Sequence, residues 1–284
     1  MSPPCLESID RYNSLMSLEC ATATGGGRAE HVLLHRQGPV SVVTLNRPEV
    51  RNALSRRMLR DLIGVLVEAE GCQETGAIVL TGAGPGFCSG DDLSEAASTD
   101  AATFDQSIGL LQRLTRTLLD LKKPSIAAIN GAAMGGGLEL TLACDLRVAA
   151  QRAVFACPEV AWGLVVTNGA SVLLPAIVGH GRARDMVLTG RTFDAAWALA
   201  AGLVGEVLPD DRLLDRAMAL AEGMASRSQA VRLTRRLFDD AGKEAIVNAL
   251  AREAEAVGRA RRGPAGEKGL RDFAARRSGE GTGR

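Results

Sequence analysis

Apolar and polar positions change their spacing along this chain, and each spacing predicts an element of secondary structure. Val32–His35 and Val40–Leu45 are apolar, β-branched runs separated by a Gly-Pro turn, which is typical of a β-hairpin. From Ser55, which can cap a helix, apolar residues recur at helical spacing through about Glu70. The short apolar run Ala77–Thr81 predicts a buried strand.

The rest of the pattern alternates in the same way and then becomes helical. A helix is predicted over Ala102–Leu121 and a buried strand over Ser125–Asn130, followed by short strands at Leu146–Ala149 and Val154–Ala156. From about Asp211 the pattern becomes mostly helical, and helices are expected over Arg212–Ala225, Gln229–Asp239 and Glu244–Arg259. The last segment, Glu267–Arg277, is charged, with Leu270 and Phe273 as its apolar anchors. Alternating strands and helices followed by a helical tail predict an α/β fold with parallel strand pairing.

Composition narrows the classes of protein. The 284 residues suffice for a large core, and 33 basic residues balance 33 acidic ones, so no net field favours nucleic acid or an anionic membrane. The six cysteines form no Cys-x-x-Cys pair, which favours reduced thiols and predicts no metal site. The first residues do not resemble a signal peptide, and no apolar run is long enough for a membrane helix. We therefore expect a soluble, cytoplasmic protein.

The strongest chemical signal is the glycine triplet Gly135-Gly136-Gly137, with Glu139 two residues later and Glu159 after a further short strand. Glycines leave backbone N–H groups accessible, and the apolar run that follows predicts a helix whose first N–H groups have no acceptor. Such amides beside two carboxylates indicate an enzyme that stabilises an oxyanion while moving protons. The alternative is a tight turn with a solvent-facing Glu139, and Glu159 after a proline is by itself ordinary loop chemistry.

A second glycine-rich segment, Gly82–Leu93, follows a predicted strand. It does not fit a dinucleotide-binding loop, because Phe87 occupies the place of the third glycine, and it lacks the Gly-Lys-Ser/Thr of a phosphate-binding loop. The histidines are His31, His35 and His180. None lies in a motif suited to a catalytic triad, although a serine hydrolase using His180 stays an alternative.

Taken in order, the motifs resemble those of the crotonase superfamily, the enoyl-CoA hydratase/isomerase family. The resemblance covers roughly residues 30–275 and rests on these segments: Leu45-Asn-Arg-Pro-Glu-Val-Arg-Asn-Ala-Leu54, Phe87-Cys-Ser-Gly-Asp-Asp-Leu93, Lys123-Pro-Ser-Ile-Ala-Ala-Ile-Asn-Gly131, Gly135-Gly-Gly-Leu-Glu139, Cys144-Asp145, Phe155-Ala-Cys-Pro-Glu-Val160, Val187-Leu-Thr-Gly190 and Ala200-Ala-Gly-Leu-Val204. The ordered set is far more specific than any single segment.

The resemblance implies an α/β spiral of ββα repeats with a C-terminal helical trimerisation region. The expected organisation is a flexible N-terminal extension over residues 1–28, a crotonase-like core over 29–225 and an oligomerisation region over 226–284. The resemblance also implies that the protein forms a homotrimer or a dimer of trimers. The implied partner is an acyl-CoA thioester, and no cofactor is expected because coenzyme A is part of the substrate.

For the site, the resemblance implies that the backbone N–H groups of Asp91 and Gly136 bind the thioester oxygen. Glu139 and Glu159 are implied to hold one water, one as a base and the other as a proton donor to the α carbon. The substrate-binding residues that we predict are Arg51, Ala53, Ser89, Gly90, Asp92, Leu93, Trp162, Thr167 and Phe273. Trp162 is a candidate pocket wall or plain core, and Phe273 is expected at the adenine end, across a subunit interface.

Two positions depart from the family's hydratases. A Pro-Gly pair usually follows the second glutamate, and Val166 and Thr167 stand in its place. Asp91 occupies a position that is often small or apolar, and our interpretation is that its side chain points away from the site.

The predicted activity is hydration of a 2-enoyl-CoA or the reverse dehydration. The alternatives are an enoyl-CoA isomerase, another crotonase-type enzyme acting on a specialised acyl-CoA, and a non-catalytic acyl-CoA-binding protein.

Overall fold

The computed structural model describes residues 31–277, so the predicted extension over residues 1–28 lies outside the described residues. The strands are β1 Val32–Gln37, β2 Val40–Leu45, β3 Ala77–Gly82, β4 Ser125–Ile129, β5 Ala133–Met134, β6 Leu146–Ala150, β7 Val154–Ala156, β8 Phe193–Asp194 and β9 Glu206–Leu208. The α-helices are α2 Arg56–Gly71, α3 Leu93–Ala97, α4 Ala101–Asp120, α5 Gly136–Leu142, α6 Ala170–Val178, α7 His180–Thr189, α8 Ala195–Ala200, α9 Leu213–Ala225, α10 Ser228–Arg261 and α11 Pro264–Arg277. Three 3-10 helices join them: η1 Pro48–Val50, η2 Glu159–Trp162 and η3 Asp210–Arg212.

Six strands form the main sheet, in the order β1-β2-β3-β4-β6-β9. The predicted hairpin is confirmed, because β1 and β2 pair antiparallel with Val32 opposite Leu45. All the other pairs in this sheet are parallel. A smaller sheet joins β5, β7 and β8. The predicted α/β fold with parallel pairing is therefore confirmed.

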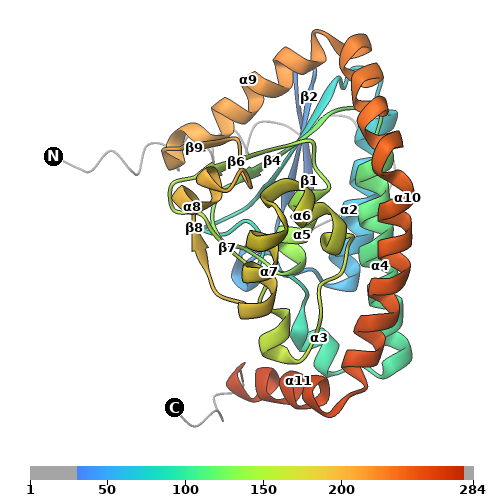
Figure 1. Cartoon of the computed structure of the whole chain (residues 1–284). Coiled ribbons are helices and arrows are strands. Elements are labelled where there is room, and N and C mark those ends of the chain that lie inside the picture. Colours follow the sequence, from blue (N-terminus) through green and yellow to red (C-terminus); the bar gives the residue numbers. More distant parts are fainter. Residues whose placement is uncertain (1–30, 278–284) are drawn as a thin grey trace, which may run out of the picture.

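Side chains of the central strands alternate between two hydrophobic layers. Val79 and Ile126 face α9, whereas Leu80 and Ala127 belong to the layer that includes α2 and α4. Both layers are buried, which explains why the parallel strands are apolar throughout. Figure 1 shows the sheet at the centre, α9 at one end, and α10 running along the outside of α4.

The long C-terminal helix corrects one prediction. The sequence pattern indicated separate helices over Gln229–Asp239 and Glu244–Arg259, but α10 continues through the intervening residues without a break. Gly242 in this stretch costs about 1 kcal/mol relative to alanine. Packing of α10 against α4 and α6 offsets that cost, and Lys243 forms an ion pair with Asp120 of α4 at 3.3 Å.

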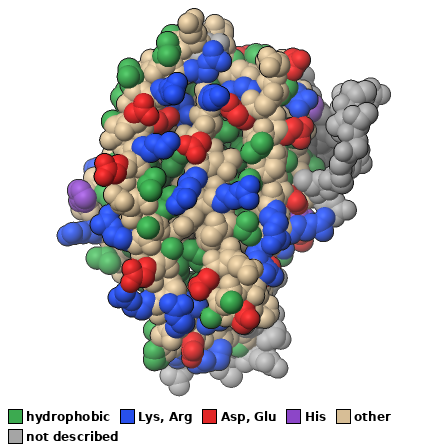
Figure 2. Space-filling model, turned by 90° about the vertical axis from the view of Figure 1, so that its right-hand side faces the viewer, with side chains coloured by type: hydrophobic (Ala, Val, Ile, Leu, Met, Phe, Trp, Pro, Cys, Tyr) green, Lys and Arg blue, Asp and Glu red, His purple; other side chains and the backbone are tan. Residues whose placement is uncertain are grey.

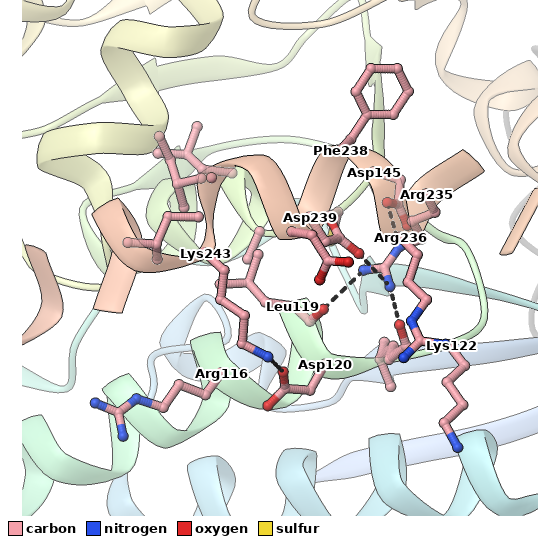
Figure 3. Close-up of a pocket in the computed structure, with 18 of the residues that line it drawn as sticks. Arg116, Leu119, Asp120, Lys122, Asp145, Arg235, Arg236, Phe238, Asp239 and Lys243 are labelled. Carbon is pink, nitrogen blue, oxygen red and sulfur yellow. Dashed lines mark hydrogen bonds and ion pairs between the residues drawn. The ribbon is translucent and has the colours of Figure 1, made fainter. Parts of the chain in front are cut away.

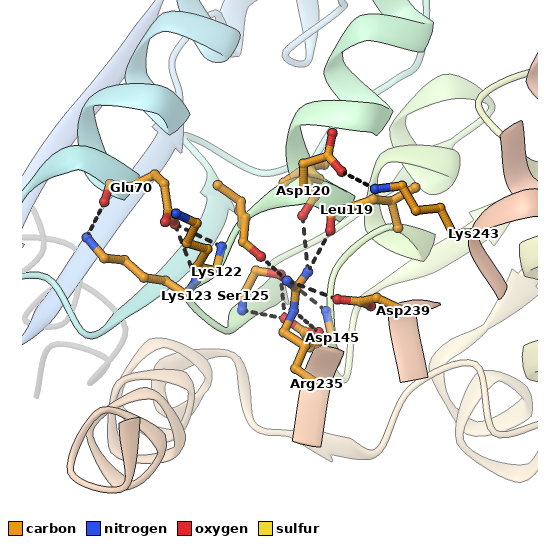
Figure 4. Close-up of polar contacts among 12 residues, drawn as sticks. Glu70, Leu119, Asp120, Lys122, Lys123, Ser125, Asp145, Arg235, Asp239 and Lys243 are labelled. Atoms are coloured by element: carbon orange, nitrogen blue, oxygen red, sulfur yellow. Dashed lines mark hydrogen bonds and ion pairs between the residues drawn. The ribbon is translucent and has the colours of Figure 1, made fainter. Parts of the chain in front are cut away.

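Arg235 of α10 fastens this helix to the body of the protein. Its Nε donates to Asp145 at 2.6 Å. Its Nη1 donates to the carbonyl oxygen of Leu121 and forms an ion pair with Asp239 at 3.2 Å (Figure 4). Asp145 also accepts hydrogen bonds from the backbone and the hydroxyl of Ser125 at the start of β4. The arginine is 9% exposed, so these bonds are little screened by water.

Candidate active site

The loops that follow β2, β3 and β4 meet at one edge of the main sheet, as expected at the carboxyl ends of parallel strands. The Leu54 N–H donates to the Gly90 oxygen at 2.8 Å, and the Met134 N–H donates to the Cys88 oxygen at 3.0 Å. Gly90 has a φ of 92°, and a Cβ there would lie 2.7 Å from the Met134 oxygen. Only glycine allows this close contact between the loops.

This contact brings two backbone N–H groups together. Gly90, which precedes Asp91, lies so close to the triplet that a Cβ on it would be 3.3 Å from the Gly136 nitrogen. Gly136 is the first residue of α5, where an N–H has no acceptor within the helix. Over residues 31–277 neither the Asp91 nor the Gly136 N–H donates a backbone hydrogen bond. Both are therefore available to an oxygen of a ligand.

Glu139, in the first turn of α5, is 1% exposed and fully hydrogen-bonded. Its Oε1 accepts the Thr167 N–H at 2.8 Å, and its Oε2 accepts the Thr167 hydroxyl at 2.9 Å and Asn168 Nδ2 at 2.8 Å. Burial first, and the charge of Glu159 second, raise its pKa well above the usual value, while the Thr167 bonds oppose that rise. The solvent-facing alternative for Glu139 is wrong.

Glu159, at the start of η2, has the opposite environment. Both carboxyl oxygens are buried, and neither has a hydrogen-bond partner among the described residues. Burial is the main cause that raises the pKa of Glu159 to about 7, and the charge of Asp91 adds to it. The carboxyl group lies against the triplet, since a Cβ on Gly135 would be 2.9 Å from Oε1.

The structure corrects our interpretation of Asp91. Its carboxyl group points toward the triplet, because a Cβ on Gly136 would lie 2.5 Å from Oδ1. Oδ1 is buried and has no partner within the described residues. Burial raises the pKa of Asp91 to about 6. The site therefore contains a third carboxyl group, because glycine at position 136 leaves room for it.

A pocket of about 470 Å³ opens in front of these groups. Asp91, Gly136 and Glu159 line it together with eight of the predicted substrate-binding residues: Arg51, Ala53, Ser89, Gly90, Asp92, Leu93, Trp162 and Phe273. Thr167 does not line it, because its side chain is buried behind Glu139. Asp92 lines it while its carboxylate caps α3 and pairs with Arg47 at 3.2 Å.

Phe273 of α11 and Trp162 of η2 form one wall of this pocket. Their rings meet edge to face with centroids 5.2 Å apart. Of the two alternatives for Trp162, a pocket wall or plain core, the structure shows the pocket wall. Phe273 lines the pocket of its own chain. The resemblance instead implied that Phe273 lies across a subunit interface. Its contact with the adenine end stays a prediction.

A larger cavity of about 1080 Å³ lies elsewhere, between α10 and the bodies of α4 and α6. Figure 3 shows Arg116, Lys122, Arg235 and Arg236 around it, with Phe238 extending from α10. None of Asp91, Glu139 and Glu159 lines it. Its size alone therefore does not make it the catalytic site.

Three polar residues that organise the site were not predicted from the sequence. Asn52 is fully buried, and its Nδ2 is 3.0 Å from each of three loop carbonyl oxygens. Asn168 bonds Glu139 from a left-handed backbone conformation, with a φ of 59°. Glu253 of α10 accepts the backbone N–H of Gly169 at 2.7 Å and of Ser171 at 2.9 Å. Asn168 before Gly169 is the one local signal among these, since an asparagine before a glycine is typical of a turn.

Among the described residues, no cluster of three or more His, Cys, Asp or Glu side chains has the arrangement of a metal site. Over the same part of the chain, no helix has the length and apolar character needed to cross a membrane.

Comparisons with known proteins agree with this geometry. The sequence profile of the enoyl-CoA hydratase/isomerase family matches residues 35–281. A short-chain-enoyl-CoA hydratase of Clostridium acetobutylicum is 37% identical over 231 residues, which is 80% of this chain and 88% of that relative. A 2,3-dehydroadipyl-CoA hydratase of Escherichia coli is 39% identical over 198 residues, 69% of this chain and 76% of the relative. An enoyl-CoA hydratase crystal structure from Mycobacterium avium subsp. paratuberculosis superimposes with a TM-score of 0.79, at 29% identity, over 87% of this chain and 96% of its own.

The fold and the paired glutamates beside free backbone amides define an enzyme of the crotonase type. The chain belongs to the enoyl-CoA hydratase/isomerase family. The predicted family and the crotonase-like fold are thus confirmed, and the relatives support an enzyme of the hydratase kind.

Proposed function

We propose that this protein adds water to a 2-enoyl-CoA thioester, or removes it from the 3-hydroxyacyl-CoA. The observation that carries the proposal is the pair Glu139 and Glu159, two buried carboxyl groups with opposite hydrogen bonding. Glu159 lines the pocket, and Glu139 is buried beside it without lining the pocket itself. The family acts on acyl-CoA thioesters, and coenzyme A enters as part of the substrate with no further cofactor.

The thioester oxygen binds between the N–H groups of Asp91 and Gly136 in this proposal. Addition of water at the β carbon moves negative charge onto that oxygen, and fixed amide donors stabilise the resulting enolate. Because these donors are backbone groups held by two loops, they need little reorganisation during the reaction.

The unlike surroundings of the glutamates divide the proton transfers. Burial and the charge of Glu159 raise the pKa of Glu139, and the three hydrogen bonds that it accepts oppose that rise because they favour its ionised form. In this proposal the ionised Glu139 accepts a proton from water as the water oxygen attacks the β carbon. Glu159 has no such donors and a pKa of about 7, so it holds the proton that passes to the α carbon. Dehydration is the same sequence in reverse.

Kinetics of two isosteric variants test the proposal. Glu139→Gln and Glu159→Gln each remove one proton transfer, so turnover of crotonyl-CoA or a longer enoyl-CoA should fall about 10²- to 10⁴-fold. The product of the unmodified enzyme should be heavier than the substrate by one water. Normal rates in both variants would contradict the assignment.

An enoyl-CoA isomerase is the second candidate. The observation that favours it is Thr167, which bonds Glu139 directly where family hydratases carry a glycine that helps to hold the water. Mass analysis separates the two reactions, because isomerisation leaves the mass of the acyl-CoA unchanged.

We also propose that the protein assembles as a homotrimer or a dimer of trimers. Exposed apolar side chains on α10, among them Leu233, Leu237 and Phe238, support self-association. Figure 2 shows this side of the molecule, where apolar side chains lie among mixed basic and acidic ones. Cytoplasmic location stays a prediction from the sequence.

A further inference from the structure

Asp91 contributes more to the site than its backbone N–H. Its Oδ1 occupies the space next to Gly136. A Cβ built on Gly136 would lie 2.5 Å from this Oδ1 and 3.6 Å from Leu54 Cδ1. The side chain of Asp91 thus lies against Gly136, whose N–H has no acceptor within α5. One oxygen of this carboxyl group is buried without a partner, and a buried polar atom of this kind is costly unless a ligand satisfies it.

The acidic groups that face Asp91 come from two other elements. Glu139 on α5 and Glu159 on η2 both interact with its charge. Cys88 in the same loop is a buried thiol whose pKa is raised to about 12, first by burial, so it is neutral. Glu49, before the left-handed turn at Arg51, adds a further carboxylate to the lining of the pocket.

No cation in the described range forms an ion pair with Asp91. Arg47, the closest candidate in the preceding loop, donates to Asp92 at 3.2 Å and to the Ala53 oxygen at 2.7 Å. Arg51 lines the outer part of the pocket with an exposed side chain. An ionised Asp91 would therefore interact unfavourably with the charges of Glu139 and Glu159, and no cation among the described residues pairs with it.

We propose that Asp91, as a neutral carboxylic acid, donates a third hydrogen bond to the thioester oxygen, beside the N–H groups of Asp91 and Gly136. This inference rests on the proposed function, since it concerns the same enolate. No covalent step is involved, and the Asp91 proton stays on its carboxyl group throughout. A carboxylic acid held neutral by a poorly solvated site can act as such a donor.

The electrostatics support this protonation state. Burial raises the pKa of Asp91 to about 6. At about pH 5 to 5.5 the group is therefore mostly neutral even before substrate binds. As the pH rises above that range, ionised Asp91 accumulates and opposes enolate formation.

The test compares Asp91→Asn, which keeps a neutral donor, with Asp91→Ala, which has none. The first readout is the near-ultraviolet absorbance of the enolate of bound acetoacetyl-CoA, which reports stabilisation of the oxyanion without requiring hydration. The second readout is kcat for an enoyl-CoA. Asp211→Asn on η3, an exposed aspartate outside the pocket, is the matched control, and thermal melting checks that each variant is folded.

We expect Asp91→Ala to lose about 10²-fold in kcat and most of the enolate signal at about pH 5.5, whereas Asp91→Asn stays within a few-fold of the unmodified protein. The ratio of the Asn variant's enolate signal to that of the unmodified protein should rise with pH above about 6.

Equal losses in the two variants would overturn the proposal, since they would assign Asp91 a role as an anion or a base. An Ala variant as active as the unmodified protein at about pH 5.5 would overturn it too, as would an unmodified protein that forms no enolate.

Failure of the proposed function has a different signature. An unmodified protein that enolises bound acetoacetyl-CoA but adds no water to any enoyl-CoA would contradict the hydratase assignment. In that case the Asn and Ala variants would still differ in enolate signal if Asp91 is a donor.

Discussion

Glu139 and Glu159 are the same residue type, and the protein gives them different chemistry through their neighbours. Donors from Thr167 and Asn168 surround the first, and the second has none among the described residues. Because each hydrogen bond to a carboxylate favours its ionised form, the pair carries a built-in asymmetry. Two predictions at the residue scale test it.

Removal of one donor should weaken catalysis while substrate binding persists. In Thr167→Val the backbone N–H still bonds Glu139, but the hydroxyl that lies 2.9 Å from Oε2 is lost. A bond to a charged group is worth about 1.5 kcal/mol, so kcat should fall roughly tenfold with little change in KM. Steady-state kinetics check this, and Thr167→Ser should restore the rate. A raised KM at constant kcat would show instead that Thr167 contacts the substrate.

Glu159 should lower stability as the pH rises. Its pKa is raised to about 7 in the folded protein from 4.5, so the folded state binds more protons than the unfolded state between these values. Stability is therefore lost as the pH rises from about 4.5 to 7, by an amount on the order of 3 kcal/mol. Urea unfolding of Glu159→Gln should show a gain over the unmodified protein at about pH 8 and little gain at pH 4.5. An equal gain at both pH values would contradict a titrating origin.

At the scale of elements, the long helix α10 supports the catalytic loop from outside. Glu253 accepts two N–H groups at the start of α6, so its carboxylate caps that helix from a neighbouring one. The same loop carries Thr167 and Asn168, which hold Glu139. The orientation of Glu139 thus depends on Glu253, which lies 84 positions after the Gly169 that it bonds.

Glu253→Gln should therefore reduce both stability and kcat. The side chain is 5% exposed, and an amide in its place presents N–H groups to backbone donors, at a cost of about 2 kcal/mol. Loosening of the loop should lower kcat about tenfold, with KM less affected. Thermal unfolding and kinetics measure the two effects. Glu255→Gln is the matched control on the same helix, because Glu255 is exposed and its ion pair with Arg259 lies at the surface. Unchanged kcat in a destabilised Glu253→Gln protein would limit this residue to a structural role.

At the scale of the whole molecule, the sequence predicted features of the backbone better than the directions of side chains. The glycine triplet and the buried strands are local patterns, so Gly136 and Glu159 could be located in advance. The direction of Asp91 depends on the empty space over a glycine 45 positions away, which no local pattern encodes. Glu253 carried no signal, since a glutamate on a long helix is ordinarily solvent-exposed.

The same limit applies to α10, which was predicted as two helices. The polar, glycine-containing stretch around Gly242 disfavours a helix locally, and only packing against α4 and α6 makes it continuous. The continuous helix in turn presents a long outer face. Its exposed apolar side chains support the proposed assembly, in which further copies of the chain would cover them.

Phe238 offers the sharpest test of that assembly. It lies in α10 at the rim of the larger cavity and is 76% exposed, and burying a phenylalanine side chain is worth about 2 kcal/mol. Phe238→Asp should therefore shift the protein toward monomers in sedimentation velocity at about micromolar concentration. Val67→Asp is the matched control, since Val67 is 58% exposed and belongs to α2, which packs on α4 and the β1–β2 hairpin. This variant should leave the assembly intact. An unmodified protein that sediments as a monomer, or an assembly unaffected by Phe238→Asp, would rule out this face as the interface.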